Sequence, residues 1–254
     1  WVCGSSTSPP KSSSSSPKKQ KRGFSMKQPS KLLTIFTSLC LSLTLLTAAI
    51  AVPILCRPFY YSQIKALELV KASGFSEGVI RGAFDQVMDY LVFNRPFGTG
   101  ELRWSEEGMA HFADCKRLFQ LDFIVLAAAG AFLLLVFLVL RQQRDFHRFL
   151  GRGPCFWAFM GMLLILGGLA LWAVLDFGSL FTAFHRLFFP GKTNWTFDPR
   201  LDEIILILPE AFWARAAALT AGLALGGGLL LTILEAILSR RPKYKNIYEE
   251  LKHR

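Results

Sequence analysis

Four long apolar runs, separated by polar segments, dominate the pattern of this chain. Each run has about 20 residues or more, the length that an α-helix needs to cross the hydrocarbon core of a bilayer. The runs are Leu32–Cys56, Phe119–Leu140, Pro154–Leu175 and Phe212–Leu238. The pattern therefore predicts an all-α fold: a polytopic membrane protein with four transmembrane helices and a membrane domain over residues 32–240.

The beginning of the chain allows more than one interpretation. Ala49-Ile50-Ala51 resembles the small-residue cleavage site of a signal peptide, but the first run is longer than a typical signal segment, so we favour a retained helix. Residues 1–31 are rich in Ser, Pro and Lys and cannot bury a core, which predicts a disordered basic tail. The chain opens with Trp1, and Met26 is an alternative physiological start.

The segments 57–118 and 176–211 lie between spans and show helical patterns of their own. Ser76 precedes apolar residues at helical spacing from Val79 to Val92, which predicts a capped helix. Ser105, followed by two Glu residues, predicts a second capped helix that continues into the second span. Residues 176–189 carry five Phe, so we expect this segment to lie along the membrane surface as a helical cap.

Composition excludes several classes of protein. Apolar residues make up 52% of the 254 residues, only 19% are charged, and mean hydropathy is +0.36. These values argue against an ordinary soluble enzyme and a disordered protein, and five Cys are too few for a disulfide scaffold. Cys56 and Cys115 both fall in the predicted outer regions. Three interpretations of these two cysteines stay open: one disulfide between them, a nucleophilic thiol, or simple buried thiols.

Basic residues gather in three segments, which predicts the orientation. Residues 1–31 hold seven Lys or Arg and no acid, 141–153 hold four against one acid, and 239–254 hold six against two. Together they carry +14, more than the whole chain's net charge of +11. Because basic segments stay in the cytoplasm, both termini, including the basic tail 241–254, are expected there. No nucleic-acid motif accompanies the charge, so no nucleic-acid partner is expected.

Two of the four histidines are candidates for chemistry. His111 lies on the second capped helix and His185 in the Phe-rich segment, both near the predicted outer interface. Asp114 and Cys115 share a helix face with His111, and Asp114 could orient its imidazole. The competing interpretation is that each histidine is only a polar interfacial residue. No phosphate-binding loop, nucleophile elbow or zinc motif is present, so neither metal nor cofactor is expected. Glu235 is expected to pair with Arg240 or Arg241.

Three stretches resemble the signatures of a bacterial four-span membrane family that includes the lipoprotein intramolecular transacylases. Residues 104–116, WSEEGMAHFADCK, resemble the pattern F-S-E-x-E-x-x-H-M-x-D-V-K, with Phe112 in place of Met and Cys115 in place of Val. Residues 184–199 resemble the second signature through the residues FHxxFF and NWxFDP, and residues 208–213, LPExFW, resemble its ending. The resemblance covers about residues 32–240.

The resemblance implies a reaction, a substrate and a location. Such an enzyme moves the sn-2 acyl chain of a diacylglyceryl lipoprotein onto the lipoprotein's own N-terminal cysteine amine, in the bacterial cell membrane. Its catalytic residues would be His111 and His185, with Asp114 orienting His111, and Asn194, Trp195 and Asp198 would bind substrate. Membrane lipids and diacylglyceryl lipoproteins would be the partners. A non-enzymatic assembly partner or sensor, and another lipid acyl-ester enzyme, stay open as alternatives.

Overall fold

The computed structural model describes residues 1, 31–140 and 148–239, and these residues form nine α-helices. The expected N-terminal and C-terminal tails, apart from Trp1 and Lys31, lie outside the described residues, as does half of the 141–153 loop. The helices are α1 (Lys31–Leu55), α2 (Arg57–Ala66), α3 (Leu69–Ser73), α4 (Glu77–Phe93), α5 (Glu106–Leu140), α6 (Pro154–Leu175), α7 (Phe177–Phe188), α8 (Ile204–Ile207) and α9 (Glu210–Ser239).

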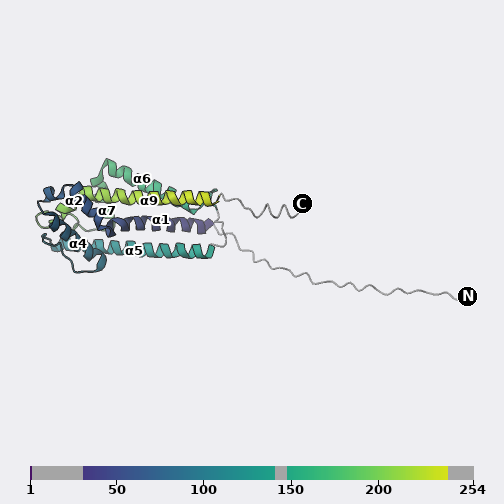
Figure 1. Cartoon of the computed structure of the whole chain (residues 1–254), viewed down its shortest axis with the longest axis horizontal. Helices are drawn as coiled ribbons and strands as arrows, with labels where there is room; N and C mark the ends of the chain where they lie inside the picture. Colours follow the sequence, from purple (N-terminus) through teal and green to yellow (C-terminus); the bar gives the residue numbers. More distant parts are fainter. Residues whose placement is uncertain (2–30, 141–147, 240–254) are drawn as a thin grey trace.

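Four of these helices, α1, α5, α6 and α9, are long and apolar enough to cross a membrane. They run along one common direction as a bundle (Figure 1). In α5, α6 and α9 only 11% of the most apolar window is buried, so large apolar side chains such as Phe137, Leu164 and Val174 point outward. Lipid covers such a surface in a membrane protein, whereas water would not. The predicted fold class is confirmed.

Helix α1 is the central element of the bundle because it packs against α5, α6 and α9. Most of its buried positions are small or hydroxyl-bearing, and they include Thr34, Thr37, Ser38, Ala49 and Ala51. Small side chains let helices approach closely in a membrane, where water does not drive them together. One hydroxyl also bonds across the bundle: Ser42 Oγ donates to the Ala158 carbonyl at 3.3 Å.

Glu235, near the end of α9, serves as a cap for another helix. The backbone N–H groups of Cys155 and Phe156, at the start of α6, donate to its carboxylate. Gly153 makes this approach possible, because a Cβ there would lie 2.1 Å from Glu235 Oε1. The first N–H groups of a helix have no partner within the helix, and a carboxylate stabilises them. Arg240 and Arg241, the partners expected for Glu235, lie outside the described residues.

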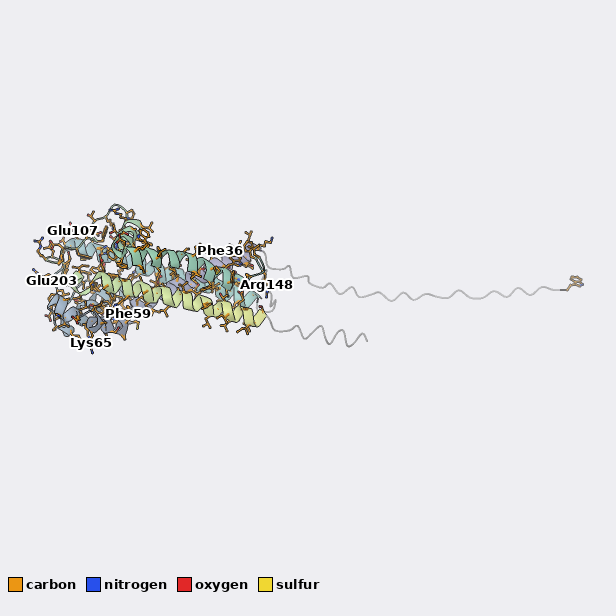
Figure 2. All side chains as sticks on the ribbon, turned by 90° about the horizontal axis from the view of Figure 1, so that it is seen from above. Phe36, Phe59, Lys65, Glu107, Arg148 and Glu203 are labelled. Carbon is orange, nitrogen blue, oxygen red and sulfur yellow. The ribbon has the colours of Figure 1, made fainter. Side chains whose placement is uncertain are left out.

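The remaining helices form a cap at one end of the bundle, opposite the end where α1 begins and α9 ends (Figure 1). Figure 2 shows Glu107 and Glu203 at the cap end, and Phe36 and Arg148 at the other. The cap has its own core, in which the Tyr60 ring stacks on Phe84 at 3.6 Å and the Tyr60 hydroxyl donates to the Ile207 carbonyl at 2.9 Å. This arrangement gives the cap a packed interior like that of a soluble domain.

Helix α4 confirms the prediction made from its periodicity. Ser76 Oγ accepts a hydrogen bond from the Val79 N–H at 3.3 Å, as an N-cap residue does. The buried face consists of apolar residues at helical spacing: Ile80, Ala83, Phe84, Val87, Met88 and Leu91. Helices α2, α3 and α8 are not predicted from the sequence, because each is too short for a periodic pattern to stand out.

Candidate active site

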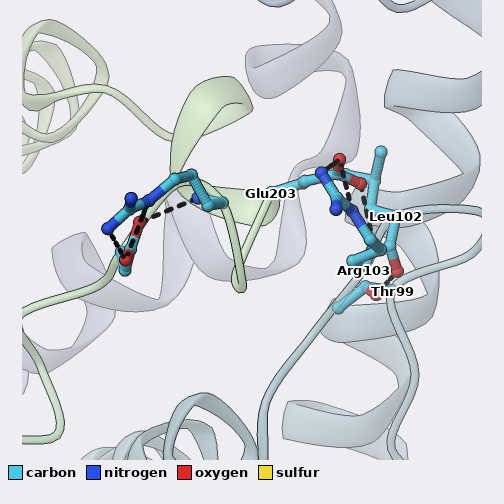
Figure 3. A network of polar contacts seen from close by, with 6 residues as sticks. Thr99, Leu102, Arg103 and Glu203 are labelled. Atoms are coloured by element: carbon cyan, nitrogen blue, oxygen red, sulfur yellow. Dashed lines mark hydrogen bonds and ion pairs between the residues drawn. The ribbon is translucent and has the colours of Figure 1, made fainter.

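The site begins with the fixed start of α5. Ser105 Oγ accepts from the Gly108 N–H at 3.0 Å, which confirms the predicted cap, and donates to Asp202 Oδ2 at 2.7 Å. Asp202 also accepts from the Ser105 N–H at 2.8 Å, so the turn before α8 is bonded to the first turn of α5. Next to it the Arg103 side chain donates to Glu203 Oε1, with Nε at 2.8 Å (Figure 3). These bonds fix the helix end one turn before His111.

The structure brings His111 and His185 together. The centroids of their rings are 5.7 Å apart, although 74 residues separate them in the chain. Helix α7 follows α6 directly and packs against it, and it extends far enough to place His185 beside the first turns of α5. Only 5% of His111 and 6% of His185 is exposed. The structure therefore places the two histidines side by side, and their catalytic role stays a prediction.

His185 is held in one orientation with one proton position. Its Nδ1 lies 2.7 Å from the Phe181 carbonyl oxygen, and because a carbonyl only accepts, Nδ1 carries the proton. In the neutral ring Nε2 then keeps a lone pair. Trp195 stacks on the ring at 4.8 Å. Burial lowers the pKa of His185 from its ordinary value of 6.5, while the bond to Phe181 opposes this shift, so the neutral ring is favoured.

His111 has a different set of neighbours. Its Nε2 lies 3.4 Å from Cys115 Sγ, one turn further along α5. Its Nδ1 is buried and has no hydrogen-bond partner among the described residues. The rings of Phe189 and Phe197 meet the imidazole edge-on at 5.0 and 5.5 Å. A buried polar atom without a partner is rare in native structures, and at such a site it suggests a position that a substrate fills.

Asp114 lies next to the pair, but the structure does not place its carboxylate on the His111 imidazole. It accepts instead from Lys192 Nζ, and from Asn194 Nδ2 at 3.5 Å. Both partners belong to the loop after α7, so Asp114 ties this loop, and Trp195 within it, to α5. Sequence reasoning missed Lys192, since no motif marks it. Its place two residues before the Asn-Trp pair was the only signal.

The other residues predicted to bind substrate divide into two groups. Asn194 and Trp195 belong to the site, and Asn194 Oδ1 is buried without a partner among the described residues. Asp198 is half-buried just before the turn at residues 199–201, where it pairs with Arg200 at 2.8 Å, and it does not contact either histidine. The structure records Cys56 and Cys115 as free thiols, so it does not contain the disulfide considered above. Within the described ranges, no group of three or more His, Cys, Asp or Glu is arranged to hold a metal ion.

Four apolar helices and a helical cap over a buried histidine pair define this protein as a four-span integral membrane protein with a candidate acid–base site. The family model of the lipoprotein intramolecular transacylase Lit matches residues 35–213, and the chain belongs to that family. This result confirms the family resemblance seen in the sequence. The family match includes His111, His185 and the loop between α7 and α8.

Solved structures show the same fold. The membrane-integral lipoprotein intramolecular transacylase Lit from Bacillus cereus superimposes with a TM-score of 0.76 at 24% identity, covering 82% of this chain and 95% of that chain. A variant of that protein with one histidine replaced by arginine gives a TM-score of 0.70 at 23% identity, over 82% and 91%. A comparison with curated protein sequences gave no match.

Proposed function

We propose that this protein is a lipoprotein intramolecular transacylase. It moves the sn-2 acyl chain of a diacylglyceryl lipoprotein to the amine of the lipoprotein's own N-terminal cysteine, and the products are an N-acyl cysteine and a monoacylglyceryl group. Family membership supports the reaction class. The observation that carries the proposal is the pair of buried histidines, which come from two separate family-like signatures and lie 5.7 Å apart.

The chemistry asks little of the protein beyond orientation and proton transfer. The amine nitrogen bonds to the ester carbonyl carbon and loses a proton, the bond to the glycerol sn-2 oxygen breaks, and that oxygen gains a proton. Both reactants belong to one molecule, so holding them in place supplies much of the rate enhancement. Imidazole suits the proton transfer because it changes charge near neutral pH.

Two buried atoms at the site that lack a hydrogen-bond partner suggest how the substrate is held. His111 Nδ1 and Asn194 Oδ1 both lack a partner among the described residues. The His185 Nε2 lone pair is the third polar feature, since Nδ1 of that ring is already bonded. We assign these three atoms to the reacting amine and ester. Asp114 and Lys192 hold the loop that carries Asn194, and so they affect the reaction by positioning Asn194 rather than by contacting the reacting atoms.

Mass analysis of lipoprotein N-termini tests the proposal. In a host whose lipoproteins carry a free diacylglyceryl-cysteine amine, this protein should leave the intact lipopeptide mass unchanged. Fragmentation should show an N-acyl cysteine and a monoacylglyceryl group. His111→Ala and His185→Ala should each lower the rate by about 10²-fold or more, the usual loss for a proton-transfer group or for a hydrogen-bond donor to a developing oxyanion. His147→Ala, a histidine in the basic 141–153 segment, is the matched control.

Two other results would identify the competing functions. A gain of one acyl mass would show transfer from a separate lipid, as in another acyl-ester enzyme. Unchanged fragmentation, with the protein well expressed, would favour the non-enzymatic interpretation.

A further inference from the structure

Cys115 is the side chain that contacts a ring nitrogen of the histidine pair. Its sulfur lies 3.4 Å from His111 Nε2, and it forms no disulfide. The structure gives this sulfur no other hydrogen-bond partner among the described residues. Val, the residue at this position in the signature that this segment resembles, would offer no hydrogen bond to the imidazole.

The contact determines where the proton of a neutral His111 lies. A thiol is a weak donor and a weaker acceptor, whereas an unprotonated imidazole nitrogen is a good acceptor, so S–H donates to Nε2. Nε2 then holds the lone pair, and the ring proton lies on Nδ1. Nδ1 is the buried atom without a partner. His111 therefore presents an N–H donor to the site, whereas His185 presents a lone pair at Nε2.

The surroundings favour a neutral His111. The ring is 5% exposed and packs against the Phe189 and Phe197 rings. The charged or titratable groups that face it are His185 from α7, Lys192 from the following loop, and Asp114 from its own helix. Asp114 is already paired with Lys192, so it does little to hold a positive charge on the imidazole.

We propose that Cys115 is a positioning residue that holds His111 in its Nδ1–H tautomer and makes it the hydrogen-bond donor to the ester carbonyl oxygen. The proposal rests on the proposed function for the identity of that oxygen. His185 Nε2 then takes the proton from the attacking amine and returns it to the departing glycerol oxygen. His111 keeps its proton throughout and stabilises the negative charge that develops on the carbonyl oxygen. Protons balance, because one imidazole gains and then loses the same proton.

The tautomer can be measured without any substrate. In protein labelled with ¹⁵N-histidine, the nitrogen shifts of His111 distinguish Nδ1–H from Nε2–H, and His111→Asn identifies its signals. We expect Nδ1–H in the native protein, a shift toward Nε2–H in Cys115→Val, and the native tautomer in Cys115→Ser, whose hydroxyl also donates. Cys155→Val, at the start of α6, is the matched control and should change nothing. An Nε2–H signal in the native protein, or no change in Cys115→Val, would overturn the proposal.

Turnover provides a second readout. Cys115→Val should lower kcat by about two- to tenfold, the range for loss of one neutral hydrogen bond, with KM nearly unchanged and the rate restored in Cys115→Ser. An equal loss in both variants would indicate a packing role and overturn the proposal. An inactive native protein would refute the proposed function, whereas the tautomer measurement still tests the role of Cys115 by itself.

Discussion

At the scale of single residues, the site shows how two identical side chains acquire different properties. His185 donates from Nδ1 to a carbonyl on its own helix and stacks on Trp195. His111 instead meets a thiol and leaves Nδ1 unpaired. The free nitrogen of each ring is therefore set by the partner of the other nitrogen. The two imidazoles therefore present different groups to the site, a donor from His111 and a lone pair from His185, which suits them to different roles in the proposed reaction.

The protonation of His185 is testable by NMR. Because burial lowers its pKa, its titration midpoint should lie below the ordinary value of 6.5. The unfolded chain takes up the proton at higher pH than the folded chain, so folded-state stability should fall as the pH drops below about 6.5. A titration of ¹³C-labelled histidine, with His185→Asn to assign the signal, measures the midpoint. A value at or above 6.5 would contradict the burial that the structure describes.

At the scale of elements, the start of α5 carries the site. Ser105, Asp202 and Gly108 form a compact junction in which the helix cap and the turn before α8 share hydrogen bonds. Helix α7 has the complementary role. His185 is its only buried residue among the described ones, while Phe184, Leu187 and Phe188 are exposed. An amphipathic helix of this kind suits the membrane interface, as the sequence predicts, and it turns its one imidazole inward.

Gly108 offers a test of this junction. A Cβ at Gly108 would lie 2.1 Å from Asp202 Oδ1 and 3.1 Å from a ring carbon of Phe197. The Ser105–Asp202 cap and the Phe197 ring that packs against His111 must therefore shift. Gly108→Ala should lower the free energy of unfolding by about 1–3 kcal/mol, the usual cost of overpacking, and should reduce activity. Thermal unfolding in detergent measures the change.

The same helix supplies the control for this substitution. Gly130 has nothing within 4 Å of an added Cβ. Gly130→Ala should leave stability unchanged or raise it by up to about 1 kcal/mol, because Ala favours a helix over Gly. Equal effects at both positions would mean that the junction with Asp202 is not what makes Gly108 necessary.

At the scale of the whole molecule, the bundle and the cap bury their apolar residues in different ways. The bundle presents apolar surface to lipid, and the cap buries its own core at one end. The histidine pair lies where the two meet, one turn after Glu107, which Figure 2 places at the cap end. The start of α1 and the end of α9 both lie at the opposite end, as an even number of spans requires (Figure 1).

Orientation in the membrane is the prediction that belongs to this scale. Because basic segments stay in the cytoplasm, a reporter that is active only outside the cytoplasm should be silent when fused after Arg254. The same reporter fused after Gly100, in the cap, should be active. An active fusion after Arg254 would mean that the bundle is inverted or that the first apolar run is a cleaved signal peptide, and the histidines would then need a new assignment.

The sequence by itself determined the features that depend only on residues close together along the chain. The four spans follow from runs of apolar residues. The caps at Ser76 and Ser105 follow from a hydroxyl that lies three residues before the backbone N–H from which it accepts a hydrogen bond. The shared face of His111 and Cys115 is equally local, since four residues bring two side chains together on any α-helix. The short helices α2, α3 and α8 escaped prediction because they lack such a period.

Only the tertiary structure decided which distant groups meet. Asp114 and Lys192 are 78 residues apart, and their contact depends on how α7 and its loop return to α5. Helix spacing alone suggests that Asp114 orients His111, whereas the structure pairs its carboxylate with the ammonium group of Lys192, a stronger partner for a carboxylate. Glu235 likewise finds the start of α6. Which groups pair depends on how the helices pack, because a buried polar group must form its hydrogen bonds with the partners that the fold places next to it.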